Sequence, residues 1–149
     1  MIIVTESLER LRHLCDIIPP LLEQIPESDF VFQPSPQKWN KKEILGHLID
    51  SAANNHQRFI RIQYENEPII FYNQNQWVNL SHYKDMDTHH LIKFWKLYNL
   101  HLTELIKFIP EENLRLNGVG GDGRKFPLHF YIQDYVTHLE HHLKQLVTY

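Results

Sequence analysis

At 149 residues, 42% of them hydrophobic and 22% charged, the chain has the length and composition of one ordinary globular domain, which excludes a disordered or collagen-like protein. Its formal net charge of -3 provides no basic surface for a phosphate backbone, and no apolar run reaches the length of a membrane span. We therefore expect one domain over residues 1–149, with no export signal and neither a nucleic-acid nor a membrane partner.

The first predicted helix begins after Thr5. Apolar residues recur at helical spacing as far as Ile18, and we expect Pro19 and Pro20 to kink or interrupt the helix before it continues to its end at Pro26. This helix carries the only cysteine of the chain, Cys15, which excludes an internal disulfide and favours a reducing compartment. The predicted location is therefore cytoplasmic.

An extended connection over residues 27–39 leads to the second predicted helix, over residues 41–63. Asn40 can cap this helix, with Glu43 at the capping-box position, and the apolar residues that follow keep helical spacing. Pro68 and the residue before it favour extended backbone, so we expect the helix to end by that point.

An ordered crossover, residues 68–86, is expected to connect the second and third helices. It is rich in Asn, Gln and aromatic residues, and Trp77 and Tyr83 are its predicted anchors to the core. Asp87 is a suitable cap for the third helix, which carries an apolar stripe and stops before Pro110.

A glycine-rich turn, Gly118 to Gly123, precedes the fourth predicted helix. The turn lacks the Lys-Ser/Thr ending of a phosphate-binding loop, so we interpret it as a flexible connection. Pro127 can occupy the first turn of the last helix, whose apolar positions continue to Leu146. The predicted fold class is all-α, a four-helix bundle with long crossover connections.

Two histidines with ligand spacing lie on the fourth predicted helix. His138 and His142 are four residues apart and therefore share a helix face, so both imidazoles can converge on one metal ion. His141 lies about 100° around the helix from His142, which makes it the less suitable partner.

The third ligand is expected from another long helix. His47 lies among apolar residues of the second helix and is the best placed candidate. Three protein nitrogens leave coordination positions open for water or substrate, as in a catalytic site. Asp50 and Asp134 lie three and four residues from these histidines, so we predict that they hydrogen-bond the ligand imidazoles or act as acid or base.

A structural interpretation of the same residues stays open at this point. A lone inward histidine such as His47 is more often a hydrogen-bonded core residue than a ligand, and a chain with 11 histidines can contain a spaced pair by chance. The remaining histidines show no comparable pairing, and we interpret the three tryptophans as core residues rather than a stacking platform.

The sequence resembles the DinB-like superfamily of metalloenzymes, which includes the YfiT-like bacterial proteins. The resemblance spans most of the chain and rests on a tryptophan-led helix start with an internal histidine and on a terminal histidine pair with a trailing glutamine: Trp39, His47, Asp50, His138, His142 and Gln145. It implies an up-down-down-up bundle, a three-histidine site for one divalent ion such as nickel, zinc or iron, and a homodimer.

The resemblance also implies a small-molecule substrate. Its characterised members include S-transferases that use a low-molecular-weight thiol such as bacillithiol and a mycothiol-dependent isomerase. The expected function is therefore metal-dependent S-transfer, with hydrolysis as a related possibility. A non-catalytic metal-binding or stress-response module, and a dimeric interaction protein whose histidines are vestigial, are the alternatives.

Overall fold

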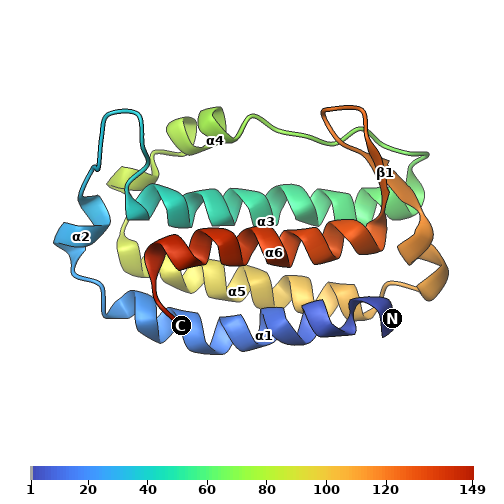
Figure 1. Cartoon of the computed structure of the whole chain (residues 1–149), viewed down its shortest axis with the longest axis horizontal. Helices are drawn as coiled ribbons and strands as arrows, with labels where there is room; N and C mark the ends of the chain where they lie inside the picture. The colour runs from blue at the N-terminus through green and yellow to red at the C-terminus, as the bar shows by residue number, and fades with distance from the viewer. Residues whose placement is uncertain (1) are drawn as a thin grey trace.

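Four long helices pack side by side in the computed structural model, which describes residues 2–149 (Figure 1). They are α1 (Ile2–Glu23), α3 (Lys41–Tyr64), α5 (Thr88–Lys107) and α6 (Leu128–Leu146). Helix α3 packs against α5 and α6, and α1 packs against the same two helices from the other side. Helices α1 and α6 run in one direction and α3 and α5 in the other, so the order is up-down-down-up (Figure 1). The predicted all-α four-helix bundle is confirmed.

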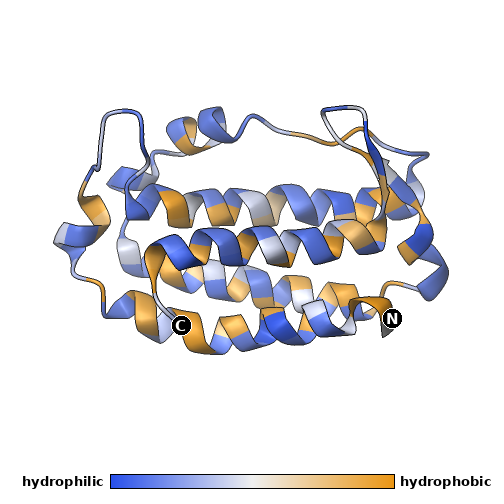
Figure 2. Cartoon of the chain, viewed as in Figure 1, coloured by the Kyte–Doolittle hydropathy of each residue, from blue (hydrophilic) through white to orange (hydrophobic). Residues whose placement is uncertain are grey.

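Each helix contributes one apolar face to a common core. Apolar and polar residues alternate along the four helices in Figure 2, and the fully buried side chains are large: Trp95, Phe59, Leu11, Leu45, Leu102 and others. The predicted capping box of α3 is confirmed, because Asn40 Oδ1 accepts from the Glu43 amide at 2.8 Å and Glu43 Oε1 accepts from the Asn40 amide at 3.2 Å. Asp87 caps α5 as predicted, accepting from the His90 amide at 2.9 Å.

The first helix differs from its prediction at its start and at its two prolines, which do not interrupt it. It begins at Ile2, before Thr5, and it continues through Pro19 and Pro20 to Glu23. Ile18 and Leu22 are fully buried on either side of the prolines. We infer that their burial offsets the backbone hydrogen bonds that the prolines cannot make.

The connection between α1 and α3 contains a short helix, α2 (Glu27–Val31), where the sequence predicted extended chain. Its Phe30 is buried in the core, and Glu27 contacts both Lys42 Nζ at 3.0 Å and Thr88 Oγ1 at 2.6 Å. These long-range contacts have no local sequence signal, which explains why residues 27–31 were predicted wrongly.

The crossover from α3 to α5 runs back along the top of the bundle (Figure 1). It contains α4 (Gln74–Ser81) and a 3-10 turn, η1 (Tyr83–Asp85). Tyr83 is buried, as predicted for an anchor, but Trp77 is 38% exposed and packs against Tyr72, with ring centroids 5.6 Å apart. Trp77 therefore stabilises the crossover itself rather than the core.

A small hairpin forms between α5 and α6, after a second 3-10 turn, η2 (Glu111–Arg115). Its strands, β1 (Asn117–Val119) and β2 (Lys125–Pro127), were not predicted because each has only three residues. The Ile70 amide donates to Val119 O at 3.0 Å, and the Val119 amide donates to Pro68 O at 2.9 Å. These bonds hold the start of the crossover against the bundle.

None of the helices in the described residues, 2–149, is both long and apolar enough to cross a membrane.

Candidate metal centre

The structure brings His47, His138 and His142 together where α3 packs against α6. His47 is fully buried on α3, and the two α6 histidines are half-buried one turn apart. One ring nitrogen of each lies within 4.8 Å of the others, and the His47 ring centroid is 5.4 Å from that of His138 and 4.8 Å from that of His142. Among residues 2–149 this is the only group of three potential metal ligands of these residue types found.

The two α6 imidazoles present their Nε2 atoms to each other. These atoms are 3.2 Å apart, close to the roughly 3.3 Å between two nitrogens that bind one tetrahedral zinc ion at about 2.0 to 2.1 Å. The Nδ1 atom of His142 is 3.0 Å from Gln145 Oε1, which only accepts hydrogen bonds. The proton of His142 therefore belongs on Nδ1, and the Nε2 lone pair is available to a metal.

His47 has fewer hydrogen-bond partners than the other two histidines of the group. Both of its ring nitrogens are buried without a hydrogen-bond partner among the described residues. Burial, followed by the nearby His142 and His138, lowers the pKa of His47 to about 3, so its ring is neutral at physiological pH. Leaving such a group unpaired costs about 1–3 kcal/mol, and coordination to a divalent ion would satisfy it. The residues present therefore fit a metal.

Asp50 lies on α3 but points to the crossover. Its Oδ1 accepts a hydrogen bond from the Tyr83 hydroxyl at 2.5 Å, and its buried Oδ2 has no partner among the described residues. Burial raises the pKa of Asp50 to about 6, against the opposing effect of the Tyr83 bond. The structure shows no hydrogen bond from Asp50 to His47, because Tyr83, from a distant part of the chain, holds the carboxylate.

Asp134 also makes no hydrogen bond to a histidine of the group. It is exposed on α6, and its charge raises the pKa of His138 against the stronger effect of burial, which lowers it. The side chain that orients an imidazole is instead Gln145. Its position three residues after His142, on the same helix face, is the signal by which the sequence could have identified it.

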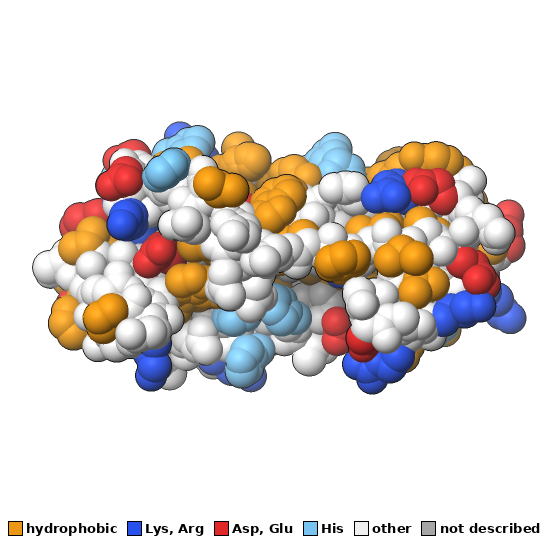
Figure 3. Space-filling model, turned by 90° about the horizontal axis from the view of Figure 1, so that it is seen from above, with side chains coloured by type: hydrophobic (Ala, Val, Ile, Leu, Met, Phe, Trp, Pro, Cys, Tyr) orange, Lys and Arg blue, Asp and Glu red, His pale blue; other side chains and the backbone are white. Residues whose placement is uncertain are grey.

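Two spaces adjoin the histidines. A groove of about 500 Å³ reaches His142 and Gln145 and is walled by Trp39, Ile44 and the start of α4. A smaller cavity of about 160 Å³ reaches His138, and Gln74 lines both spaces. In the view from above, histidine side chains gather toward the lower edge of this face, about midway along its length, beside a hollow (Figure 3). Two neighbouring spaces thus adjoin the centre.

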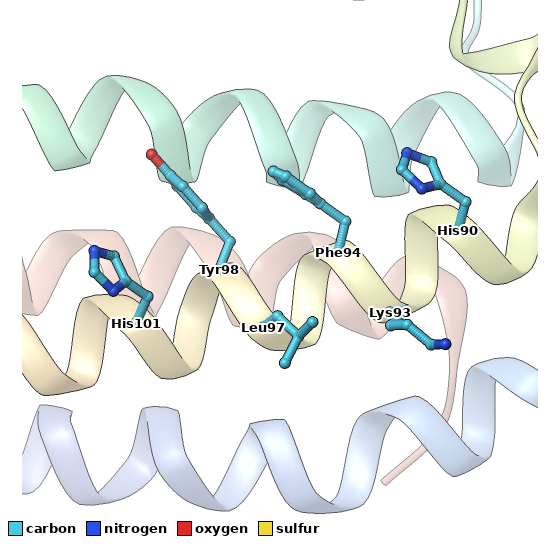
Figure 4. Close-up of a pocket in the computed structure, with 6 residues that line it drawn as sticks. All are labelled: His90, Lys93, Phe94, Leu97, Tyr98 and His101. Carbon is cyan, nitrogen blue, oxygen red and sulfur yellow. The ribbon is translucent and has the colours of Figure 1, made fainter.

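A separate apolar pocket of about 380 Å³ lies on the outer face of α5. Phe94, Leu97 and Tyr98 line it, with His90 and His101 at its two ends (Figure 4). The two imidazoles are spread along the helix rather than converging, so this pocket lacks the geometry of a metal site.

The sequence matches one protein family over most of its length. Residues 8–146 match the family model of the DinB superfamily. No curated protein sequence matches the chain significantly.

Solved structures with the same fold include YfiT from Bacillus subtilis, described as a probable metal-dependent hydrolase with an unusual four-helix bundle topology. The two chains superpose with a TM-score of 0.86 at 19% identity, over 95% of this chain and 82% of YfiT. Two structures of mycothiol-dependent maleylpyruvate isomerase, one of them a variant, give TM-scores of 0.80 and 0.78 at 11% and 12% identity. They cover 98% and 96% of this chain, which spans 61% and 60% of the isomerase chains.

Proposed function

Because this chain belongs to the DinB superfamily, we propose that it is a divalent-metal-dependent enzyme whose centre is His47, His138 and His142. The reaction is S-transfer with a low-molecular-weight thiol of the bacillithiol kind, or hydrolysis. The observation that carries the proposal is His47, a buried imidazole with two unpartnered nitrogens that faces two further imidazoles. The ion is nickel, zinc or iron, since three imidazoles accept each of them.

A metal bound here would lower the pKa of a thiol or water and so supply a nucleophile at neutral pH. The chain's own contribution is to hold the metal ion and to shield it from water. Three protein ligands leave a coordination position open, and the groove beside His142 has the size of an ordinary small-molecule pocket. Trp39, whose ring centroid is 4.8 Å from that of His47, restricts water on the groove side. The two neighbouring spaces, which share Gln74 in their lining, suit a reaction between two partners.

The comparisons support this proposal at the level of reaction class. YfiT is described as a probable metal-dependent hydrolase, and the isomerase is described as mycothiol-dependent. A metal-activated nucleophile is chemistry that hydrolysis and thiol-dependent reactions can share.

The proposal is tested by turnover of the untagged protein after reconstitution with zinc, nickel or iron. With bacillithiol, mycothiol and activated esters as substrates, we expect His142→Ala to lower the rate roughly 100-fold or more while the fold is retained. His141→Ala is the matched control, since His141 is exposed and lies outside the three-histidine group. An unchanged rate in His142→Ala would remove the metal from the mechanism.

The rival function is a non-catalytic metal-binding module. It is favoured by one observation, that neither Asp50 nor Asp134 hydrogen-bonds the histidines. Tight, stoichiometric metal binding without turnover on any substrate of the panel would establish it in place of the enzyme.

The proposal includes a cytoplasmic homodimer, formed through the α3–α5 face. Ile60, Phe94 and Leu97 on this face are 41%, 37% and 59% exposed, and the last two line the apolar pocket of Figure 4. His56, one turn before Ile60, joins the two helices by a 2.8 Å hydrogen bond between its Nδ1 and the Tyr98 hydroxyl oxygen. A two-fold axis over such a face buries the same patch of both copies.

Light scattering on the eluting protein is therefore expected to give about 36 kDa, twice the 18.0 kDa of the chain. Leu97→Glu should return the mass to that of one chain, because it would bury a charge in the interface. Leu80→Glu changes a leucine on α4 that is 71% exposed, outside the proposed interface, and should leave the dimer intact. A single-chain mass for the unmodified protein would contradict the dimer.

A further inference from the structure

The small cavity beside His138 is polar and is lined by residues of three elements. It has a volume of about 160 Å³, room for several water molecules. Its lining comes from α3, α6 and the start of the crossover: Ser51, Asn55, Arg58, Tyr72, Asp134 and His138 among them. One end of the cavity is therefore at the metal centre.

Arg58 is the only cation among the residues that line this cavity, because burial lowers the pKa of His138 and keeps its imidazole neutral. Its Nη1 donates to Asn55 Oδ1 and its Nη2 to Ile70 O, both at 3.1 Å. Its Cζ lies 5.2 Å from the ring centroid of Tyr131. These contacts fix the guanidinium in place but use only two of its five N–H donors.

The charge of Arg58 is not neutralised by a carboxylate. Burial lowers the pKa of Arg58, and none of its hydrogen bonds in the described part of the chain goes to an acidic side chain. Asp134 lines the same cavity and favours the charged guanidinium, but the two form no ion pair. A partly buried cation without a partner is costly unless an anion completes it.

We propose that this cavity binds the carboxylate of a small organic acid through Arg58, so that the rest of the substrate extends toward His138. The planar guanidinium matches a carboxylate in geometry. The inference rests on the proposed function, because it assigns the acceptor substrate to this cavity and leaves the groove beside His142 to the thiol.

A carboxylate fits the charges of the cavity better than a phosphate does. The lining holds one guanidinium and one carboxylate, that of the exposed Asp134, so a bound carboxylate adds one negative charge where a phosphate dianion adds two. A phosphate dianion would meet that aspartate without a second cation to offset it. The Tyr72 hydroxyl, hydrogen-bonded to Ser51, adds a neutral polar wall suited to an uncharged part of the ligand.

The first test uses the unmodified protein and a matched pair of probes, propionate and propionamide, at constant ionic strength. Nuclear magnetic resonance titration should show propionate shifting the Arg58 Nε–Hε signal, with propionamide producing no comparable change. The same response is expected in zinc-loaded and metal-free protein, because the anchor is the guanidinium. Equal responses to both probes, or none to either, would overturn the inference.

Variants then assign the binding to Arg58. Arg58→Gln should weaken propionate binding about tenfold or more, whereas Arg61→Gln should leave it unchanged. Arg61→Gln is a suitable control because it removes the same charge one turn further along α3. Arg61 lies outside the cavity and is paired with Glu65. Arg58→Lys keeps the charge and should retain weak binding, which covers the case in which the Gln variant does not fold. Full affinity in a folded Arg58→Gln protein would contradict the proposal.

Failure of the carboxylate site and failure of the proposed function give different experimental results. Metal content measured on each sample reports on the three histidines alone. Propionate binding to metal-free protein with no metal uptake would leave Arg58 as the anchor of a site without a metal. Zinc uptake with no propionate response would leave the metal centre and remove the carboxylate site.

Discussion

Zinc is expected to raise the melting temperature of the protein by roughly 8–16 °C at a concentration about 1000 times its dissociation constant. Binding to the native state alone contributes about 4 kcal/mol under those conditions, and each kcal/mol moves the midpoint of a chain of this size by about 2–4 °C. His47→Leu should abolish the rise, because it removes the ligand that α3 contributes. Thermal unfolding of the unmodified protein and of His47→Leu, each with and without a chelator, measures the rise and its loss.

The same substitution is expected to leave metal-free protein as stable as before, or more stable. His47 buries two ring nitrogens that no described residue satisfies, and leucine has a similar volume without that cost of about 1–3 kcal/mol. A large loss of stability in metal-free His47→Leu would show that the imidazole serves the fold. His141→Leu, on the exposed side of α6, is the control and should retain the zinc effect.

The pH dependence of the metal-free protein follows from the same residue. The folded pKa of His47 is about 3 and its ordinary value is 6.5, so the unfolded chain binds a proton in this interval that the native chain does not. Stability is therefore full above pH 6.5 and falls as pH drops toward 3, by at most about 1.4 kcal/mol per pH unit from this residue. Burial lowers the pKa of His138 in the same direction. Urea unfolding at pH 5 and pH 7 should show a smaller difference for His47→Leu.

The bundle could be predicted from the sequence because its determinants are local. Helical periodicity located the four long helices, and the Asn40–Glu43 pair identified the start of α3. Helix α2 could not be found this way, since Glu27 is held by Lys42 and Thr88 from other helices. The short strands and the continuation of α1 through its prolines likewise depend on tertiary contacts.

The candidate site was predictable where ligands share a helix and less so elsewhere. The spacing of His138 and His142 fixes their common face, while pairing them with His47 required knowing that α3 packs on α6. The partner of Asp50 is Tyr83, 33 residues away on the crossover, and no local pattern indicates it. The same is true of Arg58, whose cavity is walled by α6 and the crossover as well as by its own helix. The role of the three histidines as ligands stays a prediction until metal is measured.

Gly46→Ala is expected to destabilise the protein by on the order of 2 kcal/mol and to weaken zinc binding. A Cβ atom at position 46 would lie 2.2 Å from two ring carbons of Tyr83, so the ring or the helix must move. Overpacking of this kind costs about 1–3 kcal/mol or more, which outweighs the gain of about 1 kcal/mol in helix propensity. The Tyr83 ring cannot retreat without disturbing its hydrogen bond to Asp50, and a shift of α3 would move His47, the next residue.

Urea unfolding and zinc titration of four proteins test this coupling: Gly46→Ala, Tyr83→Ala, the double variant and Gly120→Ala. An added Cβ at Gly120 would lie 3.3 Å from Asp122 Oδ1, the end of an exposed side chain that can shift, so this substitution should cost much less than Gly46→Ala. Because the clash needs both side chains, the double variant should lose less stability than the sum of the single losses. Additive losses would mean that the Tyr83 ring is not what requires glycine beside His47. A non-additive result would show that the crossover and the metal-binding helix are fitted to each other at this contact.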